Sequence, residues 1–140
     1  ANAYGINSAT IDAAVEAKRL GAGVIAITSP AFSRQIPQGH PARHPSGRNL
    51  CDLEDVDVVI DNHMPVGDAL VEMPELDGMR VGPSSTMVNA FAVNSLVVAT
   101  IETLLSRGVR PPVWYSANMP GGDEINARHF EVYGPRIKHL

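Results

Sequence analysis

The chain lacks the features that mark several protein classes. Its formal net charge is −4 over 140 residues, and its two lysines, Lys18 and Lys138, and its scattered arginines form no basic tract. This composition argues against a nucleic-acid-binding surface. The single cysteine, Cys51, excludes an internal disulfide and fits a reducing cytoplasm. No signal-peptide pattern opens the sequence, so we expect a cytoplasmic protein.

Long hydrophobic runs and common site motifs are missing as well. The most apolar stretch follows Thr86, but polar residues interrupt it at Asn89, Asn94, Ser95 and Glu102, which argues against a membrane span. Neither GxxxxGK[ST] nor GxGxxG occurs, so the common nucleotide-binding loops are not supported. The sequence has no GxSxG elbow, and its histidines lack metal-ligand spacing. We expect no metal and no cofactor.

What the chain does contain is a regular alternation of strand and helix patterns. Hydrophobic residues make up 44% and charged residues 19%, as in an ordinary globular domain. Short apolar runs predict buried strands at Val24–Ile27 and Val56–Ile60, and helical spacing is found at Ile6–Leu20, after Thr86 as far as Gly108, and from Asp123. Pro30–Gly47 reads as a long loop, "DALVEMPE" as a third strand and Met79–Val81 as a fourth extended piece. This order predicts an α/β fold, a three-layer sandwich with a doubly wound parallel sheet flanked by helices.

Three hydroxyl residues, Ser84, Ser85 and Thr86, crowd the start of the longest predicted helix. One hydroxyl is enough to cap a helix. A helix N-terminus also offers unpaired N–H groups and partial positive charge, so the triplet is equally compatible with binding of a phosphate or carboxylate. In a doubly wound sheet it would lie beyond the carboxyl ends of the strands, where ligands bind, together with Asn2–Ser8, Thr28–Ser33 and Asn62–Asp68.

Two other stretches carry candidate functional groups. The loop from Tyr4 to Ser8 precedes a predicted helix and is either a second anion site or a plain capped loop. In "GGDEINARHF", Glu124 and His129 are five residues apart, which turns them away from each other on a regular helix. A helix cap and a surface histidine are the simpler interpretation of this stretch. Cys51 falls in a short helical turn and is expected to be packed rather than reactive.

Four stretches in a fixed order carry a resemblance to a known family. They are "GINSATIDAAVEAKRLGAGVIAITS", "HPSGRNLCDLEDVDVVIDN", "GDALVEM" followed by "VGPSSTMVNAFAVN", and "SANMPGGDEINARHFEVYGPRI". Together they span nearly the whole chain and resemble the SIS (sugar isomerase) domain family. Within it, the chain looks closest to a bacterial branch of uncharacterised phosphosugar-binding SIS-domain proteins.

The resemblance implies a five-stranded parallel sheet, assembly as a dimer or larger oligomer, and a phosphosugar lying across the strand ends. Family members hold the phosphate with a Ser/Thr-rich loop before a helix, and here Asn2-Ala3-Tyr4-Gly5 takes its place. Gly5 and Asn7 fit the pattern, whereas serines are typical where this chain has Asn2 and Tyr4. The family's first strand would lie upstream of Ala1, so an upstream fragment of the same protein or a partner chain is expected to complete the sheet.

Two functions follow from this resemblance. One is an aldose–ketose isomerase, or a related lyase, with Glu124 as base and His129 as proton shuttle, and with Asp61, His63 and Asp68 in reserve. The other is a non-catalytic phosphosugar sensor or regulatory binding module, and a purely structural subunit is a third possibility. The predicted substrate-binding residues are Asn2, Tyr4, Gly5, Asn7, Ser84, Ser85 and Thr86.

Overall fold

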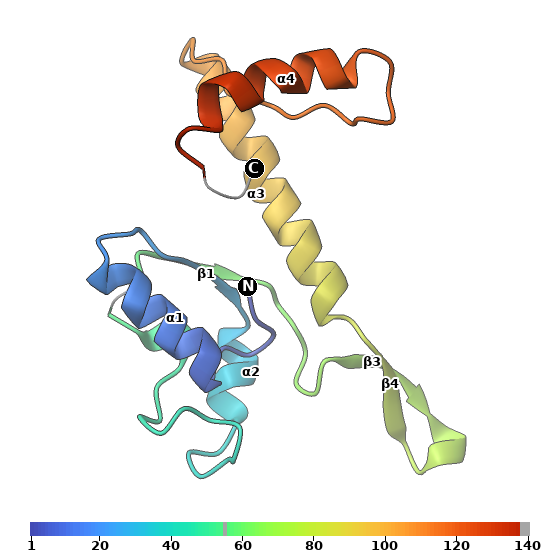
Figure 1. Cartoon of the computed structure of the whole chain (residues 1–140). Coiled ribbons are helices and arrows are strands. Elements are labelled where there is room, and N and C mark those ends of the chain that lie inside the picture. Colours follow the sequence, from blue (N-terminus) through green and yellow to red (C-terminus); the bar gives the residue numbers. More distant parts are fainter. Residues whose placement is uncertain (55, 138–140) are drawn as a thin grey trace. The chain divides into compact units, whose positions relative to one another are not determined.

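The computed structural model describes residues 1–54 and 56–137, in two compact units, Ala1–Val97 and Val98–Leu140. The chain is an α/β protein with a small parallel sheet, a small antiparallel sheet and helices (Figure 1). In chain order its elements are α1 (Ser8–Arg19), β1 (Ile25–Thr28), α2 (Pro30–Gln35), the short 3-10 helix η1 (Leu50–Asp52), β2 (Val58–Asp61), β3 (Ala69–Met73), the 3-10 helix η2 (Pro74–Leu76), β4 (Met79–Pro83), α3 (Ser85–Ser106) and α4 (Gly122–Tyr133).

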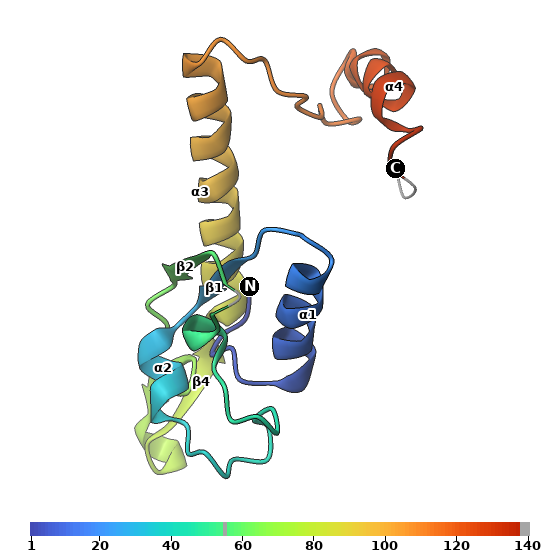
Figure 2. The same cartoon turned by 90° about the vertical axis from the view of Figure 1, so that its left-hand side faces the viewer.

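The first unit is built around α1 and the parallel pair β1–β2. Asn7 caps α1, and Lys18 and Arg19 lie in its last turn, where cations complement the helix dipole. β1 and β2 pair in parallel, from Ile25 opposite Val58 to Thr28 opposite Asp61. The strands therefore end together, and α1 lies alongside β1 (Figure 2).

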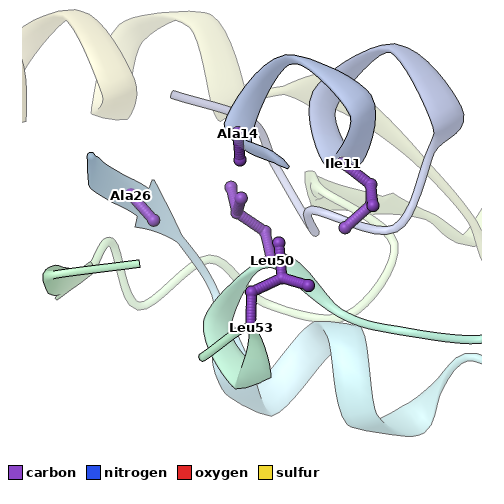
Figure 3. Close-up of a cluster of buried hydrophobic side chains, with 5 residues drawn as sticks. All are labelled: Ile11, Ala14, Ala26, Leu50 and Leu53. Carbon is purple, nitrogen blue, oxygen red and sulfur yellow. The ribbon is translucent and has the colours of Figure 1, made fainter. Parts of the chain in front are cut away.

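A small apolar core joins these elements. It consists of side chains from α1, β1, η1 and the residue after η1, namely Ile11, Ala14, Ala26, Leu50 and Leu53 (Figure 3). β1 contributes Ala26 to this core, whereas Val58 and Val59 of β2 are 48% and 39% exposed. The prediction that the second strand is buried was therefore wrong for the described chain, because β1 is the only strand that pairs with β2 there.

The segment expected as a long loop is more ordered than its composition indicates. It opens with α2, which has Pro30 at its start and the Ser29 hydroxyl accepting the N–H of Phe32 at 3.2 Å. Farther along, the guanidinium of Arg43 is buried and donates to the carbonyls of Ser33, Ile36, Pro37 and Gly47 and to the Asn49 amide oxygen. One fully hydrogen-bonded arginine thus organises a stretch with little core of its own.

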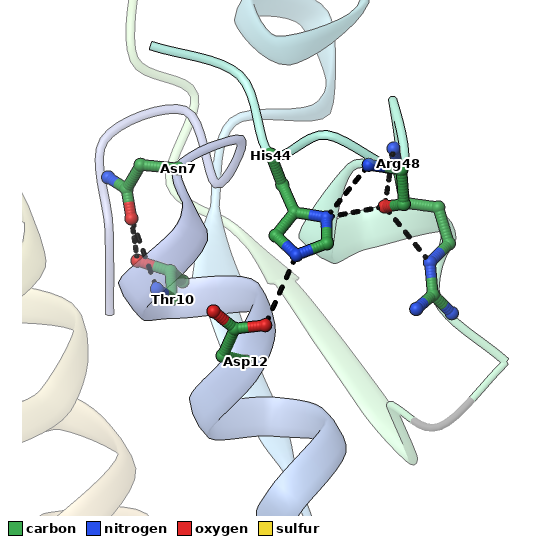
Figure 4. A network of polar contacts seen from close by, with 6 residues as sticks. Asn7, Thr10, Asp12, His44 and Arg48 are labelled. Carbon is green, nitrogen blue, oxygen red and sulfur yellow. Dashed lines mark hydrogen bonds and ion pairs between the residues drawn. The ribbon is translucent and has the colours of Figure 1, made fainter.

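Hydrogen bonds of His44 connect the same segment to α1. His44 Nε2 lies 3.1 Å from the Asp12 carboxylate, and the other ring nitrogen accepts the N–H of Ser46 at 3.0 Å (Figure 4). Because Nδ1 is the acceptor, Nε2 carries the proton that is donated to Asp12. These hydrogen bonds hold residues 44–48 beside the first turns of α1.

β3 and β4 form an antiparallel hairpin, not part of a parallel sheet. Their register runs from Ala69 opposite Pro83 to Met73 opposite Met79. The connection is too short for a parallel crossover, and it turns through Asp77 (φ 54°) and Gly78 (φ 77°). The two strands were predicted at nearly the observed positions, but a doubly wound three-layer sandwich is not found among the described residues.

α3 is long, continuous and exposed. It spans 22 residues, none of them buried, and Phe91 is 75% exposed. Despite the polar residues that interrupt its sequence, α3 is long and apolar enough to cross a membrane by length and composition, with a mean hydropathy of 1.6. This is weak evidence for a span, because the core helix of a soluble protein passes the same test.

In the second unit, α4 begins after Gly121, whose φ of 81° gives the left-handed turn that precedes the helix. The Asn126 side chain joins α4 to the preceding segment through two hydrogen bonds with the main chain of Tyr115, at 2.9 and 2.8 Å. Trp114 also contacts α4 by packing edge-on against Phe130, with ring centroids 4.9 Å apart. These contacts fold the segment before α4 back onto the helix.

Candidate functional site

The N-terminal loop lies against the carboxyl end of β1. The N–H of Asn2 donates to the Ile27 carbonyl at 2.9 Å, and the N–H of Ser29 donates to the Ala3 carbonyl at 3.2 Å. Within the loop, Asn2 Oδ1 accepts the N–H of Gly5 at 2.8 Å. The loop that carries Asn2, Tyr4 and Gly5 therefore lies at the end of β1, and Asn7 follows it as the cap of α1.

Gly5 is required by the course of this loop. Its φ is +56°, and an added Cβ would lie 2.7 Å from Leu50 Cβ and 2.9 Å from Thr28 Oγ1. Only glycine tolerates both the left-handed backbone and the close approach. The ring of Tyr4 packs on the ring of Phe32 in α2, with centroids 4.9 Å apart.

The N-terminus of α1 is capped by a neutral group. Asn7 Oδ1 accepts the N–H of Thr10 at 3.1 Å and its hydroxyl at 2.7 Å (Figure 4). The first turn contains no acidic residue. In the described part of the chain, the N–H groups of Ser8 and Ala9 have no acceptor, as is usual at the start of a helix. This helix end can therefore accept an anion from outside.

Thr28 contributes an unusual group beneath the loop. It is fully buried, and its Oγ1 has no hydrogen-bond partner among the described residues. An unpaired buried hydroxyl costs about 1–3 kcal/mol. The sequence placed Thr28 on the rim, but no local pattern marked its hydroxyl as unpaired, because that results from the tertiary packing of Gly5 against it.

The start of α3 already holds an anion, and this anion is the carboxylate of Asp68. Asp68 Oδ1 accepts the N–H groups of Ser84 at 2.9 Å and Ser85 at 2.7 Å, and Oδ2 accepts the Ser85 hydroxyl at 2.7 Å. The Ser84 hydroxyl donates to the main-chain carbonyl of Asp68 at 2.9 Å. Thr86 is exposed and forms no side-chain hydrogen bond within the described residues.

These hydrogen bonds change the acidity of Asp68. Burial disfavours the charged form, but the bonds from Ser85 and Ser84 outweigh it, so the pKa of Asp68 lies below its ordinary value. In this structure two of the three hydroxyl residues therefore serve a cap whose charge comes from 16 to 17 residues upstream. Asp68 was predicted only as a reserve residue on the rim, since no short-range pattern links it to the serines.

The end of β2 carries polar groups beside an apolar pocket. Asp61 accepts the N–H of His63 at 2.8 Å, and Asn62 Nδ2 donates to Asn89 Oδ1 at 2.9 Å. A pocket of about 540 Å³ runs from these residues along α3 and is lined by Ile60, Asp61, Asn62, His63, Val88, Phe91, Ala92, Ser95 and Leu96. Its wall is mostly apolar and offers little to a phosphate.

The predicted catalytic pair lies in the second unit, on α4. His129 Nε2 donates to the Val113 carbonyl at 3.1 Å, and the ring lies near Trp114. His129 lines a pocket together with Arg110 and Arg128, two residues that the sequence analysis did not single out. Glu124 is not among the lining residues, so the described structure does not bring the pair together.

The chain is similar over almost its whole length to bacterial proteins named UPF0309. It is 38% identical over 136 residues to one from Oceanobacillus iheyensis, which is 97% of this chain and 52% of that protein. It is 39% identical over 136 residues to one from Geobacillus kaustophilus (97% and 51%) and 41% identical over 136 residues to one from Geobacillus thermodenitrificans (97% and 52%). The chain spans about half the length of the curated relatives it matches. No family model matches it.

These findings correct the family suggested by the sequence motifs. The identification with the SIS domain family was wrong, since no family model matches and the similar proteins carry the name UPF0309. The stretches behind it combine apolar strands, a polar loop and a hydroxyl-rich helix start, a combination that many α/β folds share. The name UPF0309 states no activity, substrate or partner.

Proposed function

We propose that this protein binds a phosphorylated sugar at the loop Asn2–Ser8, with the phosphate at the N-terminus of α1. The observation that carries the proposal is a contrast between two helix ends. The start of α3 is occupied by Asp68, whereas the start of α1 has N–H groups without acceptors and no acid in its first turn. An external anion is therefore favoured at α1.

The groups around this helix end suit a hydroxyl-rich ligand. Asn7 uses its side-chain oxygen for the cap, and its Nδ2 has no partner within the described residues. The Ser8 hydroxyl is exposed. Both are hydrogen-bonding groups of the kind that recognise sugar hydroxyls, while the loop main chain is held by Asn2 and Gly5.

The sharpest test is the substitution Asn7→Asp. Aspartate and asparagine cap helices about equally well, so the unliganded protein keeps its melting temperature. The new carboxylate occupies the proposed phosphate position, so binding is lost. A sugar phosphate at 100 times its dissociation constant stabilises the parent protein by about 2.7 kcal/mol, and thermal-shift assays against sugar phosphates, free sugars and inorganic phosphate measure this.

Asn118→Asp is the matched control, because it adds the same charge at an exposed loop position in the other unit. It leaves the ligand-induced shift intact. A shift that free sugars produce equally well, or one that survives Asn7→Asp, contradicts the proposal.

Isomerisation of a sugar phosphate by groups of the second unit alone is a second candidate function, and a non-catalytic sensor is the alternative. It is favoured by the position of His129 in a pocket that also carries two arginines. Glu124→Gln separates the two: an isomerase loses turnover and keeps the ligand-induced shift, whereas a sensor has no turnover to lose.

We place the protein in the cytoplasm, where a free Cys51 stays reduced.

We also propose that the parallel pair is part of a larger doubly wound sheet in a three-layer sandwich. Ile25 is 50% exposed on β1, and the exposed α3 presents an apolar surface of the kind that proteins bury. We propose that either a homo-oligomer or an upstream fragment of the same protein covers these surfaces. Light scattering of the chain, alone and with the preceding segment of a relative, distinguishes these arrangements.

A further inference from the structure

The pocket around His129 combines an apolar wall with cationic groups. It measures about 470 Å³ and lies wholly within residues 101–129 of the second unit. Its apolar lining residues are Ile101, Leu105, Pro111, Val113 and Ile125, and its polar lining residues are Arg110, Arg128 and His129. Among the described residues, no carboxylate lines the pocket.

The two arginines have no anionic partner in the part of the chain that the structure describes. Glu124 and Glu131 lie four residues before and three residues after Arg128 on α4, the spacings at which helical ion pairs form, yet neither pairs with it. Arg110 forms no ion pair either. Guanidinium groups bind carboxylates and phosphates well, because their planar fork matches both anions.

The third polar group is held in a fixed orientation. His129 Nε2 donates to the Val113 carbonyl at 3.1 Å, and the Trp114 ring packs edge-on against the imidazole, with centroids 5.3 Å apart. These contacts keep the ring in the pocket wall. They also couple the pocket to Trp114, which is the only tryptophan in the chain.

We propose that this pocket binds a small organic anion, a carboxylate or phosphate ester with a short apolar body. The charged group lies on Arg110 and Arg128, and the apolar body packs on Ile101, Leu105 and Ile125. The site shares no residue with the loop Asn2–Ser8, so it can be tested independently of phosphosugar binding there, and His129 is the residue that it shares with the candidate isomerase.

The experiment titrates the 140-residue chain with hexanoate, hexyl phosphate, hexan-1-ol and inorganic phosphate, and follows the fluorescence of Trp114. Hexanoate or hexyl phosphate is expected to bind about tenfold or more tightly than hexan-1-ol, since a hydrogen bond to a charged group is worth about 1.5–3 kcal/mol. The tighter binder of the two anions shows whether the pocket prefers a carboxylate or a phosphate ester. Binding of hexan-1-ol as tight as that of both anions, or of inorganic phosphate as tight as that of hexyl phosphate, overturns the proposal.

Variants assign the effect to the pocket. Arg110→Gln and Arg128→Gln are each expected to weaken anion binding about tenfold and to leave hexan-1-ol unchanged. The lysine variants of both positions keep part of the affinity, because they keep the charge and lose the planar fork. Arg107→Gln is the matched control, as Arg107 is exposed in the same unit but does not line the pocket. An equal loss in Arg107→Gln overturns the proposal, since the effect is then one of net charge.

Discussion

The carboxylate of Asp68 and the hydroxyl of Ser85 are joined by a 2.7 Å hydrogen bond that closes the N-terminus of α3. The same carboxylate accepts two main-chain N–H groups at that helix end. α3 thus begins on an anion that the chain itself supplies. The hairpin β3–β4 lies between the two partners in sequence, so the cap also fixes both ends of the hairpin.

Removal of this carboxylate is expected to destabilise the protein. Asp68→Ala should lower the free energy of unfolding by about 1 kcal/mol, the usual effect of losing a helix cap. Urea denaturation measures the change. Glu75→Ala is the control, because Glu75 is an exposed acid within the same hairpin and forms no ion pair among the described residues. A loss of equal size in the control would show that the cap contributes nothing specific.

The lowered pKa of Asp68 predicts acid sensitivity. A carboxyl group whose pKa is lower in the folded than in the unfolded state stabilises the fold fully above the unfolded value. That stability is lost as the pH falls through the folded value. We expect the urea midpoint to decline below roughly pH 5.

Asp68→Asn should flatten part of this decline. The remaining slope comes from Asp52, Asp57 and Glu16, whose pKa values are also lowered, by hydrogen bonds from Asn49, Lys18 and Arg19 respectively. Urea midpoints recorded from pH 3 to pH 7 for the parent and the variant provide the comparison. Parallel curves would show that Asp68 titrates alike in both states.

The local elements could be predicted from the sequence because their signals are local. Asn7 before a helical spacing marks α1, and Gly108 marks the end of α3. α2 was missed although Ser29 and Pro30 are good start signals, since the many prolines nearby favoured a loop. The antiparallel pairing of β3 and β4 depends on the backbone at Asp77 and Gly78, which strand periodicity does not report.

In the candidate site, too, the features with a local signal could be predicted and those that depend on tertiary contacts could not. The loop from Tyr4 to Ser8 was predicted as either an anion site or a plain capped loop because it precedes a helix. The partnership of Asp68 with Ser85 was not, because it joins residues 17 apart through a turn at Asp68 with φ 67°. That Arg110 and Arg128 line one pocket also depends on how α4 folds back, which no pattern in the sequence encodes.

Gly5 allows a test of the close approach at the loop. Gly5→Ala and Gly82→Ala both place a Cβ on a left-handed backbone, at φ +56° and +75°, which costs roughly 1–2 kcal/mol in each case. Only Gly5→Ala also meets Leu50 and Thr28, whereas nothing lies within 4 Å of Gly82. Overpacking should add about 1–3 kcal/mol at Gly5. Urea denaturation of both variants measures their free energies of unfolding. Equal decreases in the two variants would show that the loop shifts to accommodate the added Cβ at no cost.

The unpaired hydroxyl of Thr28 is not expected to contribute to the stability of the unliganded protein. Thr28→Val replaces that hydroxyl with a methyl group of similar size, so the free energy of unfolding should stay the same or rise by up to about 1 kcal/mol. Thr10→Val is the control: its hydroxyl donates to Asn7 and accepts from Asn2, and its loss should cost about 1 kcal/mol.

Binding adds a second readout for the same pair of variants. If the Thr28 hydroxyl completes its hydrogen bonding only when a ligand lies over the loop, Thr28→Val weakens binding of a sugar phosphate while the unliganded protein stays as stable as before. Thermal shifts with and without ligand report both quantities in one experiment. Destabilisation of the unliganded Thr28→Val protein by more than about 1 kcal/mol would mean that the hydroxyl already has a partner in solution, and that the loop above it is packed for stability alone.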